Sequence, residues 1–144
     1  MSNAVEAVEV LKNAEASLFP AADSMELVTL LQRVRADLKL EPPEDYMAFL
    51  RLSDGAVADG LMLYGTTQRQ IEGGADMPAL IEINLSRRAY RDDLTDLLQL
   101  GEVDDDIVGF HQGEGSYWRI DRVSGDCQDK AASLKDLIEG ALAA

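Results

Sequence analysis

Residues 40–50 of the chain read LEPPEDYMAFL, and SDG follows at residues 53–55. Pro43 suits the first position of a helix, and the acidic residues directly after it favour the positive end of the helix dipole. Three large residues recur at helical spacing and predict one apolar face: Tyr46, Phe49 and Leu50. Gly55 supplies a C-terminal stop. The segment therefore predicts a short helix that is buried on one side.

Two further helices are predicted before this segment. Each begins with a capping pair three residues apart, Asn3 with Glu6 and Asp23 with Glu26. The apolar stripe of the first helix runs as far as Leu18, and Phe19-Pro20 ends it because the residue before proline avoids the α region. The second helix carries a regular apolar stripe: Leu27, Leu30, Leu31, Val34 and Leu38.

In the second half of the chain the spacing of the apolar residues changes from the period of a helix to that of a strand, which predicts strands. The predicted strands are residues 61–64, 97–100, 107–111 and 116–121, with turns at 112–115 and 124–125. A helix is predicted over residues 78–91, and a last one begins at Ser133. This order predicts an α+β fold with a mostly antiparallel sheet of about four to six strands and helices packed around it. Residues 1–22 are expected to form an N-terminal helical extension, and residues 23–144 the α+β domain.

Length and composition exclude several classes of protein. The chain has 144 residues, 47% hydrophobic and 28% charged, which suits one globular domain. A single histidine, His111, and a single cysteine, Cys127, exclude zinc sites that need several such ligands and leave one candidate catalytic base. The run Asp104-Asp105-Asp106 lacks the spacing of a calcium loop. We therefore expect no metal, no cofactor and no enzymatic activity. The unpaired cysteine and the absence of a leader or membrane-spanning pattern favour the cytoplasm.

Net charge is the most distinctive property of the sequence as a whole. The chain has 27 Asp and Glu against 13 Lys and Arg, a net charge of -14. Nucleic acid and anionic membranes are therefore poor partners, because both attract positive charge. The excess is concentrated over residues 92–129, where 11 acidic and two basic residues give a net of -9. Such a surface serves solubility, or it steers a basic protein partner.

The strand over residues 116–121 predicts both a core face and a contact face. Alternation puts Trp118 and Ile120 on one side and Tyr117, Arg119 and Asp121 on the other. Because the first pair is apolar, Trp118 is expected to be buried against the helices, in the same core as Tyr46. Tyr117 and Arg119 are expected to be exposed, since such residues are common anchors of protein interfaces.

The segment over residues 40–55 resembles the signature of the SUKH superfamily, a Pro-x-Asp-Tyr-x-x-Phe-Leu helix followed by Asp-Gly. This superfamily includes fungal cell-wall-assembly regulators and many bacterial immunity proteins. The resemblance continues in order through about residue 142, and GLMLYGT at residues 60–66 is similar to the YrhA-like branch. Two features depart from the common pattern: the helix before Asp23, and Glu41-Pro42-Pro43 in place of Leu-Pro.

The resemblance implies a protein-binding domain that neutralises a toxin by direct contact in the cytoplasm. Many such toxins are nucleases, which are basic because they hold phosphates. The alternatives are a regulatory or scaffolding module without a toxin partner, and a hydrolase that uses a pair of carboxylates. The predicted contact residues lie mainly in the acidic half, with Asp54 and Asp59 as a second possible location: Asp104, Asp105, Asp106, Glu114, Tyr117, Arg119 and Asp121.

Overall fold

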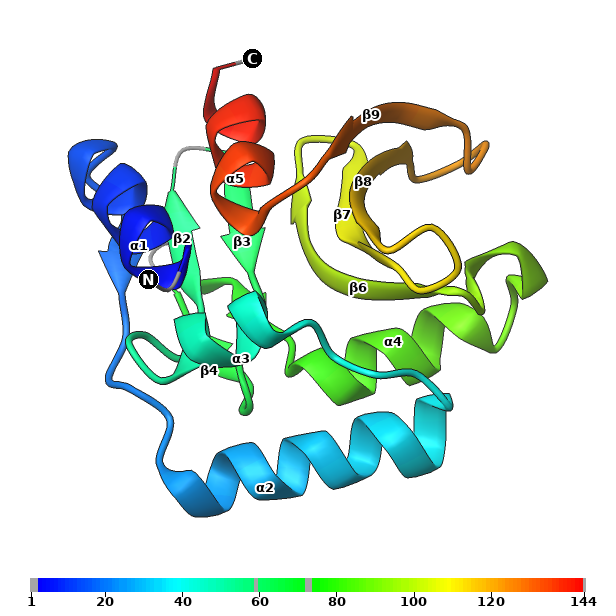
Figure 1. Cartoon of the computed structure of the whole chain (residues 1–144), viewed down its shortest axis with the longest axis horizontal. Helices are drawn as coiled ribbons and strands as arrows, with labels where there is room; N and C mark the ends of the chain where they lie inside the picture. Colours follow the sequence, from blue (N-terminus) through cyan, green and yellow to red (C-terminus); the bar gives the residue numbers. More distant parts are fainter. Residues whose placement is uncertain (1–2, 59, 72–73, 144) are drawn as a thin grey trace.

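The structure, a computed structural model, describes residues 3–58, 60–71 and 74–143 (Figure 1). Its α-helices are α1 (Asn3–Asn13), α2 (Ser24–Arg33), α3 (Glu44–Leu50), α4 (Leu80–Arg88) and α5 (Leu134–Leu142). Its strands are β1 (Ser17–Leu18), β2 (Ala56–Ala58), β3 (Leu61–Leu63), β4 (Arg69–Gln70), β5 (Asp76–Met77), β6 (Leu97–Val103), β7 (Asp106–His111), β8 (Ser116–Asp121) and β9 (Cys127–Ala131). A π-helical turn, Val34–Leu38, extends α2, and a 3-10 helix, Asp92–Leu94, follows α4.

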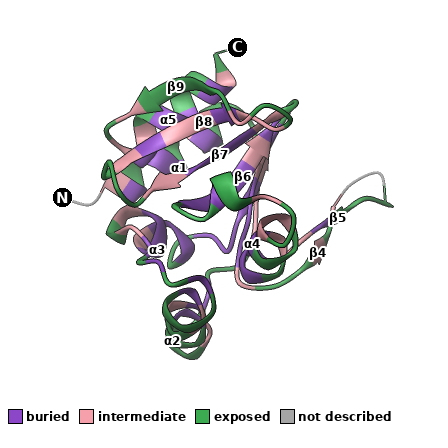
Figure 2. Cartoon of the chain, turned by 90° about the vertical axis from the view of Figure 1, so that its right-hand side faces the viewer, coloured by how far each residue is buried: buried purple, intermediate pink, exposed green. Residues whose placement is uncertain are grey.

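Seven strands form one antiparallel sheet in the order β1-β2-β3-β6-β7-β8-β9, and β4 and β5 form a separate hairpin. The chain leaves the large sheet after β3, builds the hairpin and α4, and returns at β6, which pairs with β3. The α+β prediction is confirmed, but the sheet is larger than expected. The strands that sequence patterns missed are short or polar, such as the two-residue β1 and the exposed β9, which reads CQDKA (Figure 2).

The main core joins the sheet to buried residues of α1, α2, α3, α4 and α5, with α1 packed against both α3 and α5. The three large residues of the predicted short helix, Tyr46, Phe49 and Leu50, are all buried in it, as expected. The Tyr46 hydroxyl donates to the carbonyl oxygen of Tyr64 at 2.5 Å and lies 3.1 Å from that of Leu100. Tyr46 therefore fixes α3 to the place where β3 and β6 meet.

A second, smaller cluster occupies the other face of the sheet: Leu94, Leu97, Ile107 and Ile120. Trp118 is half-buried against this cluster, so the prediction that it shares the main core is wrong. Its ring stacks on His111 with centroids 4.1 Å apart, and the Lys130 ammonium lies 4.4 Å from its centre. Both faces of the sheet are partly covered, and Trp118 points to the one with the smaller core.

The N-terminal segment contributes both to the main core and to the large sheet. α1 ends at Asn13 rather than at Phe19, and Leu18 lies in β1, which pairs with β2. Four residues of α1 enter the main core: Ala4, Ala7, Val8 and Leu11. The Asn3 side chain accepts a hydrogen bond from the backbone N–H of Lys135, at the start of α5, so it ties together the two ends of the chain.

Several local predictions are confirmed. Asp23 and Glu26 form the reciprocal capping box at the start of α2, and the Ser133 side chain caps α5. The predicted helix over residues 78–91 is α4, which spans Leu80–Arg88. Gly55 has a φ of 101°, in the region that favours glycine, and it turns the chain from α3 into β2.

Candidate protein-interaction surface

Three acidic segments of the second half of the chain meet at one end of the large sheet. Asp106 pairs with Asp121 in the register of β7 and β8, so the β6–β7 and β8–β9 turns lie at the same end. The Arg122 N–H donates to the carbonyl oxygen of Asp105 at 3.1 Å and joins these turns. The segment after α4 joins them through Arg91, whose guanidinium donates to the Arg122 carbonyl oxygen at 2.8 Å. We call this surface the acidic end; its carboxylates belong to Asp92, Asp93, Asp104, Asp105, Asp121 and Asp126.

Local hydrogen bonds hold the β8–β9 turn in one conformation. The Asp121 carboxylate accepts the backbone N–H groups of Val123 and Ser124, both at 2.9 Å. These two bonds, that from Ser124 most strongly, lower the pKa of Asp121. Gly125 completes the turn with a φ of 79°.

The carboxylates of the acidic end divide into paired and unpaired groups. Asp93 binds Arg91 at 2.7 Å, and the neighbouring Asp106 binds Arg119 at 2.6 Å. Within the described part of the chain, four exposed carboxylates of this end form no ion pair: Asp92, Asp104, Asp105 and Asp126. Their charge is therefore open to a partner, whereas Asp106 and Arg119 are already matched and less than one fifth exposed.

Glu102 connects the acidic end to the body of the protein, and nothing in the sequence pattern pointed to it. Its carboxylate accepts hydrogen bonds from the Tyr64 hydroxyl at 2.7 Å and the Arg87 guanidinium at 2.5 Å, and it lies 3.5 Å from Arg122. Burial alone would raise the pKa of Glu102, but these donors and the two positive charges outweigh it and lower that pKa. Arg122 is thereby held on the side of the turn that faces the protein.

Glu114 does not belong to the acidic end. It lies in the β7–β8 turn, at the opposite end of six-residue strands that span roughly 20 Å. Its carboxylate pairs with Lys130 at 3.1 Å. The residues predicted to form one contact face therefore lie at two opposite ends of the sheet. Exposed carboxylates without an ion pair are concentrated at the end that carries Asp104 and Asp105.

Tyr117 is not an exposed anchor, so this prediction is wrong. Its side chain is 2% exposed and lies in the main core, edge-on to Phe110 with centroids 5.1 Å apart. Tyr117, Arg119 and Asp121 do share one face of β8, as alternation predicted. That face, however, is the one that the core helices cover.

The second predicted location of contact is also structural. The Asp54 side chain is buried, 1% exposed, and it accepts hydrogen bonds from the Thr66 N–H and hydroxyl, both at 2.7 Å. Arg69 completes its shell at 3.0 Å. The Asp54 side chain therefore holds the loop after β3 in place and is not accessible to a partner. Asp59 lies outside the residues that the structure describes.

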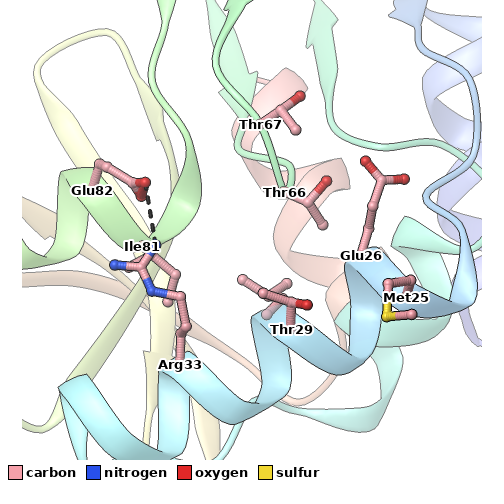
Figure 3. A pocket seen from close by; sticks show the side chains of 9 residues that line it. Met25, Glu26, Thr29, Arg33, Thr66, Thr67, Ile81 and Glu82 are labelled. Atoms are coloured by element: carbon pink, nitrogen blue, oxygen red, sulfur yellow. Dashed lines mark hydrogen bonds and ion pairs between the residues drawn. The ribbon is translucent and has the colours of Figure 1, made fainter.

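A pocket of about 240 Å³ lies between α2, the start of α4 and the loop after β3 (Figure 3). Leu30 and Ile81 give it an apolar lining, and Glu26 and Glu82 stand on opposite sides of it in Figure 3. Glu26 belongs to the capping box of α2, and Glu82 pairs with Arg33 at 3.3 Å. Both carboxylates serve local structure, so the pocket is an apolar recess with a charged rim.

Among the described residues, no helix is long and apolar enough to cross a bilayer. Nor do three His, Cys, Asp or Glu side chains gather anywhere in that part of the chain in a way that could hold a metal ion. The chain matches no model of a known protein family and no curated protein.

Proposed function

We propose that this protein is a non-enzymatic binding domain that neutralises a basic protein partner by direct contact through the acidic end. The observation that carries the proposal is the convergence of three turn segments, which places four unpaired carboxylates on one rigid surface. Fixed carboxylates on a protein of net charge -14 attract a basic partner from a distance and speed its approach.

The resemblance to the SUKH superfamily gives this binding a biological form. In that reading the protein is a bacterial immunity protein that acts in the cytoplasm, and its partner is a toxin. A nuclease toxin must be basic to hold phosphates, so it would match the acidic end in sign. A regulatory or scaffolding module would use the same surface on a partner that is not toxic.

Co-expression with the products of the adjacent genes tests the proposal. We expect one of them to be a basic protein that stops cell growth alone, and co-expression of this chain to restore growth. The double variant Asp104→Asn/Asp105→Asn should bind the purified toxin about tenfold more weakly in calorimetry, since each exposed pair contributes up to about 1 kcal/mol. The matched control is Glu9→Gln/Glu15→Gln, which removes two exposed charges in and after α1.

Three results would distinguish the readings. Growth rescue that is weakened by the acidic-end variant and not by the control supports the immunity function. A basic partner that binds in the same charge-dependent way but is not toxic supports the regulatory module. Binding that is equally strong for both variants would contradict the acidic end as the contact surface.

A further inference from the structure

Two large apolar side chains at the acidic end are exposed to an unusual degree. Tyr90 is 90% exposed and Val123 is 86% exposed. Among the described residues, the next most exposed large apolar side chain is Met25 at 74%, and the others reach at most 50%. Isolated exposed apolar residues are common on protein surfaces, but here both lie where the unpaired carboxylates gather.

The backbone that carries these side chains is held in place from both sides. Arg91, the neighbour of Tyr90, binds both oxygens of the Asp93 carboxylate, at 2.8 and 2.7 Å. The same guanidinium donates to the carbonyl oxygen of Arg122, the neighbour of Val123. The Val123 N–H is itself bound by Asp121. One arginine therefore joins the segment of Tyr90 to the segment of Val123, and the two side chains project from an ordered surface.

We infer that Tyr90 and Val123 are the apolar anchors of the acidic end, and that they insert into an apolar recess ringed by Lys and Arg on the partner. This inference rests on the proposed function and names the residues that hold the complex together. Aromatic side chains on fixed backbone supply much contact area and lose little conformational freedom on binding. Charged groups around them mainly set the rate of approach, whereas buried anchors set the rate of dissociation.

The charge around the anchors identifies the kind of partner. Asp92 and Asp126 each lie within three residues of an anchor, and Asp105 is joined to the segment of Val123 through the Arg122 N–H. A partner that covers Tyr90 and Val123 must bring positive charge close to these carboxylates. Arginines also flank the anchors, but Arg91 is paired with Asp93 and Arg122 with Glu102, and Arg88 donates to the carbonyl oxygens of Leu38 and Thr95. The exposed apolar residues of α2, Met25 and Val28, lie beside recesses that Glu26, Arg33 and Arg51 line.

Photo-crosslinking in the cells that naturally make the protein tests the anchors directly. A photoreactive phenylalanine analogue replaces Tyr90 or Val123 in the full chain, and Met25 or Val28 in two matched controls. All four positions are at least half exposed, so the fold should be retained, which a thermal melt checks. We expect positions 90 and 123 to crosslink to one basic protein, identified by mass spectrometry, and the α2 positions to give none of it.

The identified protein is then purified, and its dissociation is timed from the unmodified chain and from Tyr90→Ser and Val123→Ser. Each substitution should speed dissociation about tenfold and change association less than twofold, as expected for an interface anchor. Dissociation unchanged by both substitutions would overturn the anchors and leave the proposed function standing. Crosslinks to a basic protein from α2 alone would contradict both the anchors and the acidic end as the contact surface. Crosslinks to a second copy of this chain would also overturn the inference. Crosslinks from no position would contradict the anchors and the proposed function together.

Discussion

Among single residues, the connection between α3 and the sheet depends on three consecutive ones, Ser53, Asp54 and Gly55. The Ser53 hydroxyl accepts the N–H of Phe19 at 2.9 Å and donates to the carbonyl oxygen of Gly55 at 2.6 Å. The Asp54 carboxylate binds Thr66 and Arg69. This short motif therefore connects the N-terminal segment, the end of α3 and the loop after β3.

Gly55→Ala should destabilise the protein more than Gly115→Ala. Both glycines have a positive φ, so both substitutions cost about 1–2 kcal/mol in backbone strain. At Gly55 the added Cβ would also lie 2.8 Å from the carbonyl oxygen of Leu63, whereas no atom lies within 4 Å of one added at Gly115. Urea denaturation of the two variants measures the difference. Equal losses would show that the backbone around Gly55 moves aside.

At the scale of helices and strands, sequence periodicity predicted which residues share a face better than which face is covered. In β8 it separated Trp118 and Ile120 from Tyr117 and Arg119 correctly. Periodicity placed the larger core on the wrong side of β8, because both faces of the sheet bury apolar residues and alternation alone does not distinguish them. The capping pair located the start of α2 correctly, whereas the first helix ends at Asn13 and not at Phe19.

The elements that sequence missed are those whose stability comes from distant partners. β1 has two residues and exists because Ser17 and Leu18 pair with β2. β9 is polar and is defined by its pairing with β8. The shell of Glu102 was missed for the same reason, since its partners Tyr64 and Arg87 come from two other parts of the chain. Local patterns carry no signal for such contacts.

Glu102→Gln should lower the free energy of unfolding at neutral pH and change how that free energy depends on pH below neutrality. The folded state lowers the pKa of Glu102 below its ordinary value of 4.5, so it favours the charged form. The stabilisation from this charge is therefore present above that value and is lost as the pH falls through the lowered pKa. We expect a loss of about 1–3 kcal/mol at pH 7 that shrinks toward pH 3.

Urea denaturation across this pH range measures the effect, with Glu9→Gln as the control for an exposed carboxylate whose nearest ammonium is 3.9 Å away. A difference between Glu102→Gln and the unmodified chain that stays constant from pH 7 to pH 3 would contradict the role given to the Glu102 charge.

Removal of residues 1–22 should abolish cooperative unfolding. The deletion takes away the four buried residues of α1 and the strand β1, and it uncovers the face of α5 that α1 covers. Loss of an integral part of the core leaves too little buried apolar area to hold a domain of this size. Circular dichroism during heating tests this. A sharp melting transition in the fragment 23–144 would restore the predicted division into an extension and a domain.

At the scale of the whole molecule, the fold decides which of many acidic residues can act together. The sequence located the negative charge in the second half but could not divide it between the two ends of the sheet. Pairing of β7 with β8 places Asp104 and Asp105 beside the β8–β9 turn and puts Glu114 at the far end. The exposed apolar residues of the acidic end were missed as well, because Tyr90 and Val123 stand alone in their segments with no periodic pattern.

If the acidic end attracts a basic partner, the association rate of the purified pair, measured by stopped flow, should depend on salt and on the carboxylates of this end. The rate is measured at 0.01 M and 0.1 M salt, where the Debye length is about 30 Å and 10 Å. Asp104→Asn/Asp105→Asn is compared with the unmodified chain, and Asp106 is left intact because its loss would release Arg119. We predict that association slows with added salt, and that the variant associates severalfold more slowly at 0.01 M and loses most of that difference at 0.1 M. An association rate that is independent of salt and unchanged in the variant would rule out the acidic end as the surface that attracts the partner.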